Sequence, residues 1–517
     1  MPRTVPLLAA PLLAATLAHA QPALVEGSVA GLQHQMEAGA TNAVAITRAS
    51  LDRIERFDRA GPRTRAVITT NPDALAIARD LDAERKRGKV RGPLHGITVL
   101  VKDNIDTGDN MMTTAGSLAL VGPPATKDAF IVKKLRDAGA VVLGKTNLSE
   151  WANIRSSKST SGWSAVGGQT NNAYDPRRNP CGSSSGTGTA IAASYAVVGI
   201  GTETDGSIVC PSSMAGLVGL KPTVGLVSRA GIVPISSSQD TAGPMTRSVA
   251  DAAAVLTAIA GVDPQDPATA AAQGHVASDY RSFLQGGLAG LRIGVARKRV
   301  TGYSQHTDRL YEQAIADLKR LGAEVVDNTD FGNLGDYDDA ELDVLLYELK
   351  DGMDRYLATR RGVPVRTLAD VIAFNEKNAA KEMPYFGQDL FIKAQAKGPL
   401  TDQAYIDAAA KARKLAREGI DQVLAGNRLD AIIAPTGSPA WLTDHVNGDS
   451  YLGASSSPAA VAGYPSITVP MGDVRGLPVG LSFTGTAWDE GKLLRIAHAY
   501  EQGTRRRKAP SLRTAPQ

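Results

Sequence analysis

Serine and lysine residues are the side chains of this sequence that could carry covalent chemistry. A run of serine and glycine covers residues 181–189, and a second glycine-rich run, 201–207, ends in Ser207. A serine hydroxyl can attack a carbonyl carbon when a neighbouring base takes its proton. Spacing excludes two other uses of these glycines. No lysine follows them, as a phosphate-binding loop requires, and the positions of Gly186 and Gly188 do not fit a dinucleotide fingerprint.

One candidate mechanism for these serines uses histidine. Residues 182–186 read G-S-S-S-G and match the nucleophile elbow G-x-S-x-G, with Ser184 at the turn. This interpretation needs an acidic residue and then a histidine downstream, and His445 or His498 could supply the latter. A tight turn whose hydroxyls bond to the backbone explains the same residues equally well.

A second candidate mechanism uses Lys102. This lysine ends the apolar run 97–101, which predicts a buried strand. Burial would lower the pKa of the amine, and a neutral lysine can accept a serine proton. Asp103 and Asp106 are near in sequence and would raise this pKa, so burial must dominate for Lys102 to act as the base. The residues by themselves leave both mechanisms open.

The elements that must position these residues alternate along the chain. Short apolar strands follow amphipathic helices, which predicts the α/β class with a mixed, mostly parallel central β-sheet covered by helices on both faces. The predicted strands are 97–101, 141–144, 198–202, 291–296, 324–326, 431–434 and 466–469. The predicted helices are 41–57, 72–87, 129–138, 189–198, 251–259, 308–321, 341–375 with a break at Pro364, 402–424 and 492–503.

Composition excludes several classes of protein. The 517 residues are 43% hydrophobic and 21% charged, with 52 glycines and 28 prolines, so collagen and low-complexity disorder are excluded. A net charge of +4, spread in both signs, and only 5% aromatic residues do not favour a nucleic-acid partner. Beyond the N-terminus the chain has no apolar run of about 20 residues, so no membrane-spanning helix is expected.

Residues 1–20 have the pattern of a secretory signal peptide. Arg3 provides the positive start, residues 5–17 are apolar but too few to span a bilayer, and an A-x-A cleavage motif ends at Ala20. We expect cleavage after Ala20, a periplasmic or secreted location, and no membrane association once the signal is removed. A buried N-terminal helix is the alternative, which the prolines at positions 2, 6 and 11 disfavour.

Two cysteines, Cys181 and Cys210, are present. An exported protein meets an oxidising compartment, so they could form one disulfide, but the sequence does not show whether their Cα atoms are close enough. The default expectation is two small buried hydrophobic residues. The histidines are scattered, with no HExxH or CxxC spacing, so no metal site is predicted.

Three motifs taken together resemble the amidase signature family. They are V-K-D-N at 101–104, G-S-S-S-G at 182–186 and G-T-E-T-D-G-S at 201–207. In the family the bridging serine lies 24 residues before the nucleophile. The same separation joins Ser183 to Ser207 and selects Ser183 over its neighbours.

The resemblance implies a Ser–cis-Ser–Lys triad and an acyl-enzyme. Ser207 would attack the amide carbonyl, Ser183, after a cis peptide bond, would relay the proton, and neutral Lys102 would be the base. The implied oxyanion hole consists of the backbone N–H groups of Thr204, Asp205, Gly206 and Ser207. No cofactor and no metal are implied.

The resemblance also implies how the chain is organised. One large amidase domain would cover residues 21–517, after the signal peptide at 1–20. Its catalytic core would lie at about 92–260, and a helical insertion would lie at about 335–425. The motifs are dense within the core and thin across the insertion.

Three positions depart from the general family pattern. Glu203 stands where aspartate is usual, Asp205 where glycine is usual and Val209 where arginine is usual. This variant is similar to bacterial peptide amidases, which hydrolyse the C-terminal carboxamide of peptides. We therefore expect a small peptide amide as substrate and a monomeric enzyme.

Three alternatives to this assignment stay open. The chain could be a broader amidase or esterase on small or aryl amides, or a catalytically dead peptide-binding protein. It could also be a subunit of a transamidating complex, which an export signal disfavours because tRNA is cytosolic.

Overall fold

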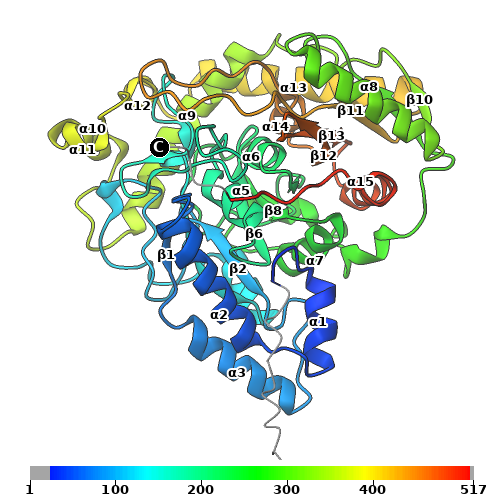
Figure 1. Cartoon of the computed structure of the whole chain (residues 1–517). Coiled ribbons are helices and arrows are strands. Elements are labelled where there is room, and N and C mark those ends of the chain that lie inside the picture. Colours follow the sequence, from blue (N-terminus) through cyan, green and yellow to red (C-terminus); the bar gives the residue numbers. More distant parts are fainter. Residues whose placement is uncertain (1–23, 513–517) are drawn as a thin grey trace, which may run out of the picture.

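One eleven-stranded sheet runs through the protein in the computed structural model, which describes residues 24–512 (Figure 1). The strand order is β1-β3-β2-β6-β8-β7-β12-β13-β11-β9-β10, and β4 and β5 form a separate hairpin. The strands are β1 (Val67–Thr70), β2 (Thr98–Lys102), β3 (Val141–Thr146), β4 (Trp163–Ser164), β5 (Gly168–Gln169), β6 (Val198–Glu203), β7 (Val218–Lys221), β8 (Thr241–Thr246), β9 (Arg292–Val295), β10 (Glu324–Val326), β11 (Ala431–Pro435), β12 (Ser466–Val474) and β13 (Leu477–Thr484).

The predicted α/β class with a mixed sheet is confirmed, but the expected balance of strand directions is corrected. Four of the ten pairings are parallel, β2–β3, β2–β6, β9–β11 and β9–β10, and the other six are antiparallel. Parallel neighbours need a crossover of a dozen or more residues, usually a helix. A tight turn joins β12 to β13, and the segment 222–240 between β7 and β8 contains no helix, so these pairs are antiparallel.

Helices cover both faces of the sheet. They are α1 (Val29–Glu37), α2 (Ala43–Arg53), α3 (Ala74–Lys86), α4 (Phe130–Asp137), α5 (Ser185–Ala192), α6 (Val209–Met214), α7 (Val249–Ile259), α8 (Gln305–Arg320), α9 (Asp338–Thr359), α10 (Leu368–Lys377), α11 (Ala379–Glu382), α12 (Asp389–Gln395), α13 (Gln403–Asn427), α14 (Ser457–Ala462) and α15 (Glu490–Thr504). Short helical turns lie at Ile54–Arg59, Leu118–Leu120, Glu150–Asn153, Pro267–Ala272 and Tyr280–Leu284.

Side chains that alternate along β2 show how the faces divide. Val99 and Val101 join one buried cluster with residues of α1, α4, α7, α8 and α15. Leu100, between them, joins another cluster with residues of α3 and α5. Successive side chains of a strand point to opposite faces, so β2 is apolar throughout because both of its faces are covered.

Helices α9 to α13 occupy residues 338–427, and α9 packs against α12 and α13. Figure 1 places α10, α11 and α12 at the end of the molecule opposite α8 and α15. No helix within residues 24–512 combines the length and the apolar character needed to cross a bilayer. The predicted signal peptide, residues 1–20, lies outside the described residues.

Candidate active site

Lys102 is the last residue of β2 and is fully buried. Its Nζ donates hydrogen bonds to Ser183 Oγ at 2.7 Å, to Thr202 Oγ1 at 2.8 Å and to the Thr202 carbonyl oxygen at 3.2 Å. The adjacent parallel strand β6 supplies Thr202. The sheet therefore brings the lysine and one of the predicted serines into direct contact, although 81 positions of sequence separate them.

The surroundings of this amine favour its neutral form. Burial lowers the pKa of Lys102 to about 7, although the negative charges of Asp240 and Glu203 act to raise it. Within residues 24–512 no carboxylate lies close enough to Lys102 Nζ to form an ion pair. A buried amine without an ion-pair partner loses its proton readily, so Lys102 can accept one near neutral pH.

The two acidic residues next to Lys102 in sequence are directed elsewhere. Asp103 lies 3.8 Å from Lys145 Nζ, and Asp106 accepts a hydrogen bond from the Tyr356 hydroxyl at 2.9 Å and lies 3.4 Å from the Arg360 guanidinium. Neither contributes to the pKa of Lys102. The sequence-based concern that these carboxylates would keep the lysine charged is therefore not borne out.

Ser183 is held by its backbone as well as by Lys102. The Gly182–Ser183 peptide bond is cis, as the family resemblance implied. The Ser149 N–H donates to the Ser183 carbonyl oxygen at 3.0 Å, and a Cβ at position 182 would collide with Ser149 Oγ. Only glycine therefore fits before Ser183 in this arrangement.

Ser207 lies in the turn between β6 and α6 and is 8% exposed, whereas Ser183 is fully buried. The Ser184 N–H donates to the Ser207 carbonyl oxygen at 3.2 Å. In the described part of the chain no hydrogen bond joins the Ser183 and Ser207 hydroxyls directly. The structure thus joins Lys102 to Ser183 by a side-chain contact and brings Ser207 alongside through the backbone.

The turn that carries Ser207 also presents backbone N–H groups. Glu203 Oε2 accepts from the N–H groups of Ile208 and Val209, at 2.7 and 3.0 Å. These are the groups at the start of α6, which need an acceptor outside the helix. Within residues 24–512, the N–H groups of Asp205, Gly206 and Ser207 donate to no protein acceptor. Thr204, the fourth predicted position, follows β6 and donates from its hydroxyl to Asp240 Oδ1 at 2.6 Å.

Gly206 makes this turn possible. Its φ of 77° is in the left-handed region, which glycine adopts at little cost. Unpaired backbone donors beside a serine can stabilise the negative oxygen of a tetrahedral intermediate. The arrangement is therefore chemically suited to acyl transfer.

Several residues of the site were not predicted from the sequence. Thr202 shares the Lys102 amine with Ser183, and Asn104 Nδ2 donates to Thr202 Oγ1 at 3.0 Å. Asp240 and Glu203 act on Lys102 through their charge. Asn104 could have been expected from the sequence, because it belongs to the motif at 101–104 and follows Lys102 by two positions.

The alternative elbow mechanism is not assembled. Ser184 Oγ donates to the Thr202 carbonyl oxygen at 3.1 Å and accepts from the Thr202 N–H at 3.2 Å, and Ser184 is fully buried. His445 hydrogen-bonds to Gln169 Oε1 at 2.9 Å, and His498 Nδ1 lies 3.0 Å from the Leu284 carbonyl oxygen. Neither histidine contacts Ser184. The hydroxyl of this serine instead holds the backbone of Thr202 and has a structural role.

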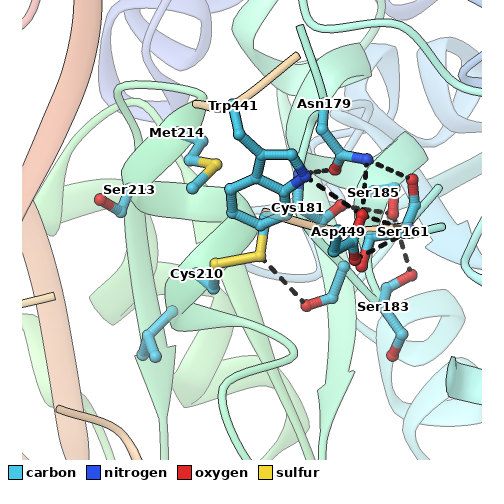
Figure 2. Close-up of a disulfide and its surroundings, with 12 residues drawn as sticks. Ser161, Asn179, Cys181, Ser183, Ser185, Cys210, Ser213, Met214, Trp441 and Asp449 are labelled. Atoms are coloured by element: carbon cyan, nitrogen blue, oxygen red, sulfur yellow. Dashed lines mark hydrogen bonds between the residues drawn. A yellow bond between two sulfur atoms is a disulfide. The ribbon is translucent and has the colours of Figure 1, made fainter. Parts of the chain in front are cut away.

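Cys181 and Cys210 form a disulfide with a Cα–Cα distance of 6.1 Å, which Figure 2 shows. This corrects the default expectation of two unpaired residues, although both are buried as expected. The fold brings the two cysteines together, because α6, which carries Cys210, packs against α5, and Cys181 lies just before α5. Among residues 24–512 no group of three or more His, Cys, Asp or Glu side chains is arranged to hold a metal ion.

A family profile and several known proteins are similar to this chain. The protein-family profile described as Amidase matches residues 45–494. The native peptide amidase from Stenotrophomonas maltophilia, a solved structure, is 55% identical with a TM-score of 0.91, over 95% of this chain and 99% of that chain. The peptide amidase PAM, solved in complex with the competitive inhibitor chymostatin, is 56% identical with a TM-score of 0.92, over 94% and 99% of the two chains.

A curated relative extends the comparison to plants. A probable amidase of Arabidopsis thaliana is 43% identical over 468 residues, which cover 88% of this chain and 86% of the relative. The similarity therefore spans nearly the whole chain in each case.

Proposed function

This chain belongs to the amidase family and is an amidase-type hydrolase, and from that premise we propose that it is an exported peptide amidase. It converts the C-terminal carboxamide of a peptide into the free acid and releases ammonia. The overall reaction consumes one water molecule. Neither a metal nor a cofactor takes part in the proposed chemistry.

The proposed mechanism begins with a proton relay. Ser207 Oγ attacks the carboxamide carbon while its proton passes to Ser183 Oγ, whose own proton passes to the neutral amine of Lys102. The carbonyl oxygen becomes an oxyanion, which the backbone N–H groups of residues 204–207 stabilise. Ser207 Oγ is now bonded to the substrate carbon in a tetrahedral intermediate.

The relay then runs in the opposite direction. Lys102 returns a proton through Ser183 to the amide nitrogen, the C–N bond breaks, and ammonia leaves an acyl-enzyme on Ser207. Water attacks this ester and gives up its proton along the same route. Lys102 returns this proton through Ser183 to Ser207 Oγ as the C–O bond to Ser207 breaks, and the peptide acid and the free enzyme result.

The contact between Lys102 Nζ and Ser183 Oγ, 2.7 Å, carries this proposal. It joins an amine whose pKa is lowered to about 7 with a hydroxyl that lies beside the Ser207 segment. The preference for peptide amides is supported by the 55–56% identity to peptide amidases over nearly the entire chain.

Export is proposed from the signal pattern at residues 1–20. The Cys181–Cys210 disulfide agrees with this location, because disulfides persist in oxidising compartments such as the periplasm. Mass spectrometry of the exported protein should find Gln21 at its N-terminus. An intact Met1 on exported protein would contradict the cleavage site.

A matched pair of peptides tests the substrate assignment. A C-terminally amidated dipeptide should yield ammonia and the free acid, and the same dipeptide with a free carboxylate should stay unchanged. Cleavage of internal peptide bonds, or no ammonia, would refute the proposal. A higher kcat/KM for aryl amides or esters than for peptide amides would favour the broader amidase instead. Failure of a serine-directed probe to label Ser207 would favour a peptide-binding protein without activity.

A further inference from the structure

A disulfide joins the two segments that carry the proposed serines. Cys181 lies two residues before Ser183, and Cys210 lies three residues after Ser207. Figure 2 shows Cys181 and Ser183 close together on one loop, with Cys210 bonded to Cys181 from the neighbouring segment. The disulfide therefore links the segment that carries Ser183 to the segment that carries Ser207. The spacing of these two segments in the fold determines the distance between the two serines.

Ser184 provides the other connection between these segments. Its N–H donates to the Ser207 carbonyl oxygen at 3.2 Å, and its hydroxyl bonds to the Thr202 backbone at 3.1 and 3.2 Å. Ser183 thus lies between a covalent connection on its N-terminal side and hydrogen bonds on its C-terminal side. Without the disulfide, these hydrogen bonds and the packing of α5 against α6 would hold the Ser183 loop against the Ser207 turn.

The environment of the disulfide restrains its Cys181 end. The two cysteines share a buried apolar cluster with Met214, Ala440 and Trp441. Trp441 Nε1 and Asn179 Nδ2 both donate to Asp449 Oδ1 at 3.1 Å, and Asn179 Oδ1 accepts from the Cys181 N–H at 2.8 Å. The loop before Ser183 is therefore fixed relative to residues 441–449, and the disulfide fixes it relative to α6.

We propose that the Cys181–Cys210 disulfide positions Ser183 against Ser207 for the proton relay. This inference rests on the roles proposed above for the two serines. Reduction by a dithiol transfers two electrons and two protons to the S–S bond, giving two thiols and the oxidised, cyclic form of the dithiol. The Ser183 loop then has one connection fewer to the Ser207 turn, so the two hydroxyls are less often aligned.

The expected effect is a loss of turnover with little change in substrate binding. Misplacement of a reacting group by 1 Å can cost about 10²-fold in rate. Because the Ser149 and Ser184 hydrogen bonds remain, we expect kcat to fall by about 10- to 100-fold and KM to change less than about threefold. Labelling of Ser207 by a serine-directed probe should slow by the same factor as kcat.

Three variants separate the bond from the individual cysteines: Cys181→Ser, Cys210→Ser and the double variant. Each breaks the same bond, so all three should lose the same factor in kcat, as residues that act as a unit are not additive. Wild-type protein treated with dithiothreitol should match them, and reoxidation should restore its activity. If the two single variants lose different factors in kcat, the effect belongs to one cysteine side chain and not to the bond, which would overturn the inference.

Stability is the competing explanation, and a time course distinguishes it. During reduction of the wild-type protein, thiol titre, activity and circular dichroism are followed together. Activity that falls with the appearance of thiols, while the circular dichroism is still native, supports positioning. Activity that falls only with the loss of native signal, or full kcat in a reduced and folded protein, overturns it.

The same experiment separates this inference from the proposed function. If oxidised wild-type protein releases no ammonia from peptide amides, the proposed function fails, and the labelling rate of Ser207 still reports on the disulfide. If oxidised and reduced proteins are equally active on peptide amides, the proposed function stands and the positioning role falls.

Discussion

The pH dependence of the reaction tests the proposed base most directly. The proposed mechanism needs Lys102 as the neutral amine, and burial lowers its pKa to about 7. With that pKa, about a tenth of the amine is neutral at pH 6 and about nine tenths at pH 8, so kcat/KM should rise about tenfold between them. A lysine at its ordinary pKa of 10.5 would instead be almost entirely charged at both values.

The assay is ammonia release from an amidated dipeptide at subsaturating concentration, from pH 5.5 to pH 9. An acid limb near pH 7 is ordinarily assigned to histidine, so histidine variants are the necessary controls. His445→Ala and His498→Ala should keep the limb, because neither ring contacts the candidate site. Lys102→Arg should be inactive throughout, because a guanidinium does not lose its proton in this range.

Two results would refute this reasoning. One is a kcat/KM that still rises steadily between pH 8 and pH 9 with no plateau, which would mean that Lys102 keeps an ordinary pKa. The other is loss of the acid limb in a folded histidine variant, which would assign the titration to imidazole. Circular dichroism across the same pH range excludes unfolding as the origin of the limb.

Three further predictions concern Ser207, the neighbouring Gly182, and Glu341, a buried carboxyl of α9. Ser207→Ala should reduce kcat by at least about 10³-fold with unchanged circular dichroism, because no other group would form the acyl-enzyme; near-normal ammonia release would exclude Ser207 as the nucleophile. Gly182→Ala should lower the free energy of unfolding by about 1–3 kcal/mol and reduce activity, because its Cβ would collide with Ser149. Its control, Gly426→Ala on an exposed part of α13, should raise that free energy by about 0.5–1 kcal/mol, as urea denaturation would measure. Burial, with the negative charge of Asp205, raises the pKa of Glu341 to about 8. Between pH 5 and pH 8 the folded protein therefore keeps a proton that the unfolded chain has lost. The free energy of unfolding falls as the pH rises through this range. Glu341→Gln should therefore raise the melting temperature at pH 8 more than at pH 5, and an equal shift at both would contradict the raised pKa.

The elements around Lys102 could be predicted from the sequence because their patterns are local. The apolar run at 97–101 corresponds to β2, and the runs at 141–144 and 198–202 correspond to β3 and β6. These are parallel neighbours, covered on both faces, and such strands are apolar throughout. Local sequence was therefore sufficient for the strands that support the candidate site.

Other strands could not be found in this way. β8 reads T-A-G-P-M-T and β13 reads L-P-V-G-L-S-F-T, and both contain the residues that usually argue against a strand. Their place in the sheet comes from neighbours distant in sequence, such as β6 for β8. The mostly parallel sheet was expected because these antiparallel members left no periodic signal.

The site residues show the same division. The family spacing predicted Lys102, Ser183 and Ser207, and the structure places Lys102 in contact with Ser183, but nothing local indicated that Thr202 would share the lysine amine. The role of Glu203 at the start of α6 was equally hidden, because it depends on how the turn at 204–207 folds.

Comparison of three buried lysines explains why one of them is suited to act as a base. Lys102, Lys145 and Lys221 are all fully buried and end or lie near the ends of β2, β3 and β7. Lys145 donates to the Ile105 carbonyl oxygen and the Thr113 hydroxyl and has Asp103 at 3.8 Å. Lys221 donates to the Pro222 carbonyl oxygen, and burial lowers its pKa to about 8 against the charges of Glu203 and Glu490.

Lys102 differs from the other two in having a serine hydroxyl among the acceptors of its hydrogen bonds. In the described part of the chain it is the one of the three that donates to a serine hydroxyl, Ser183, and the nearest oxygens around it belong to hydroxyl and carbonyl groups. An acceptor without charge does not hold the ammonium form as a carboxylate does. Burial lowers the pKa of Lys102, and its position at the end of β2 directs the amine at Ser183 Oγ, the hydroxyl that the proposed relay deprotonates.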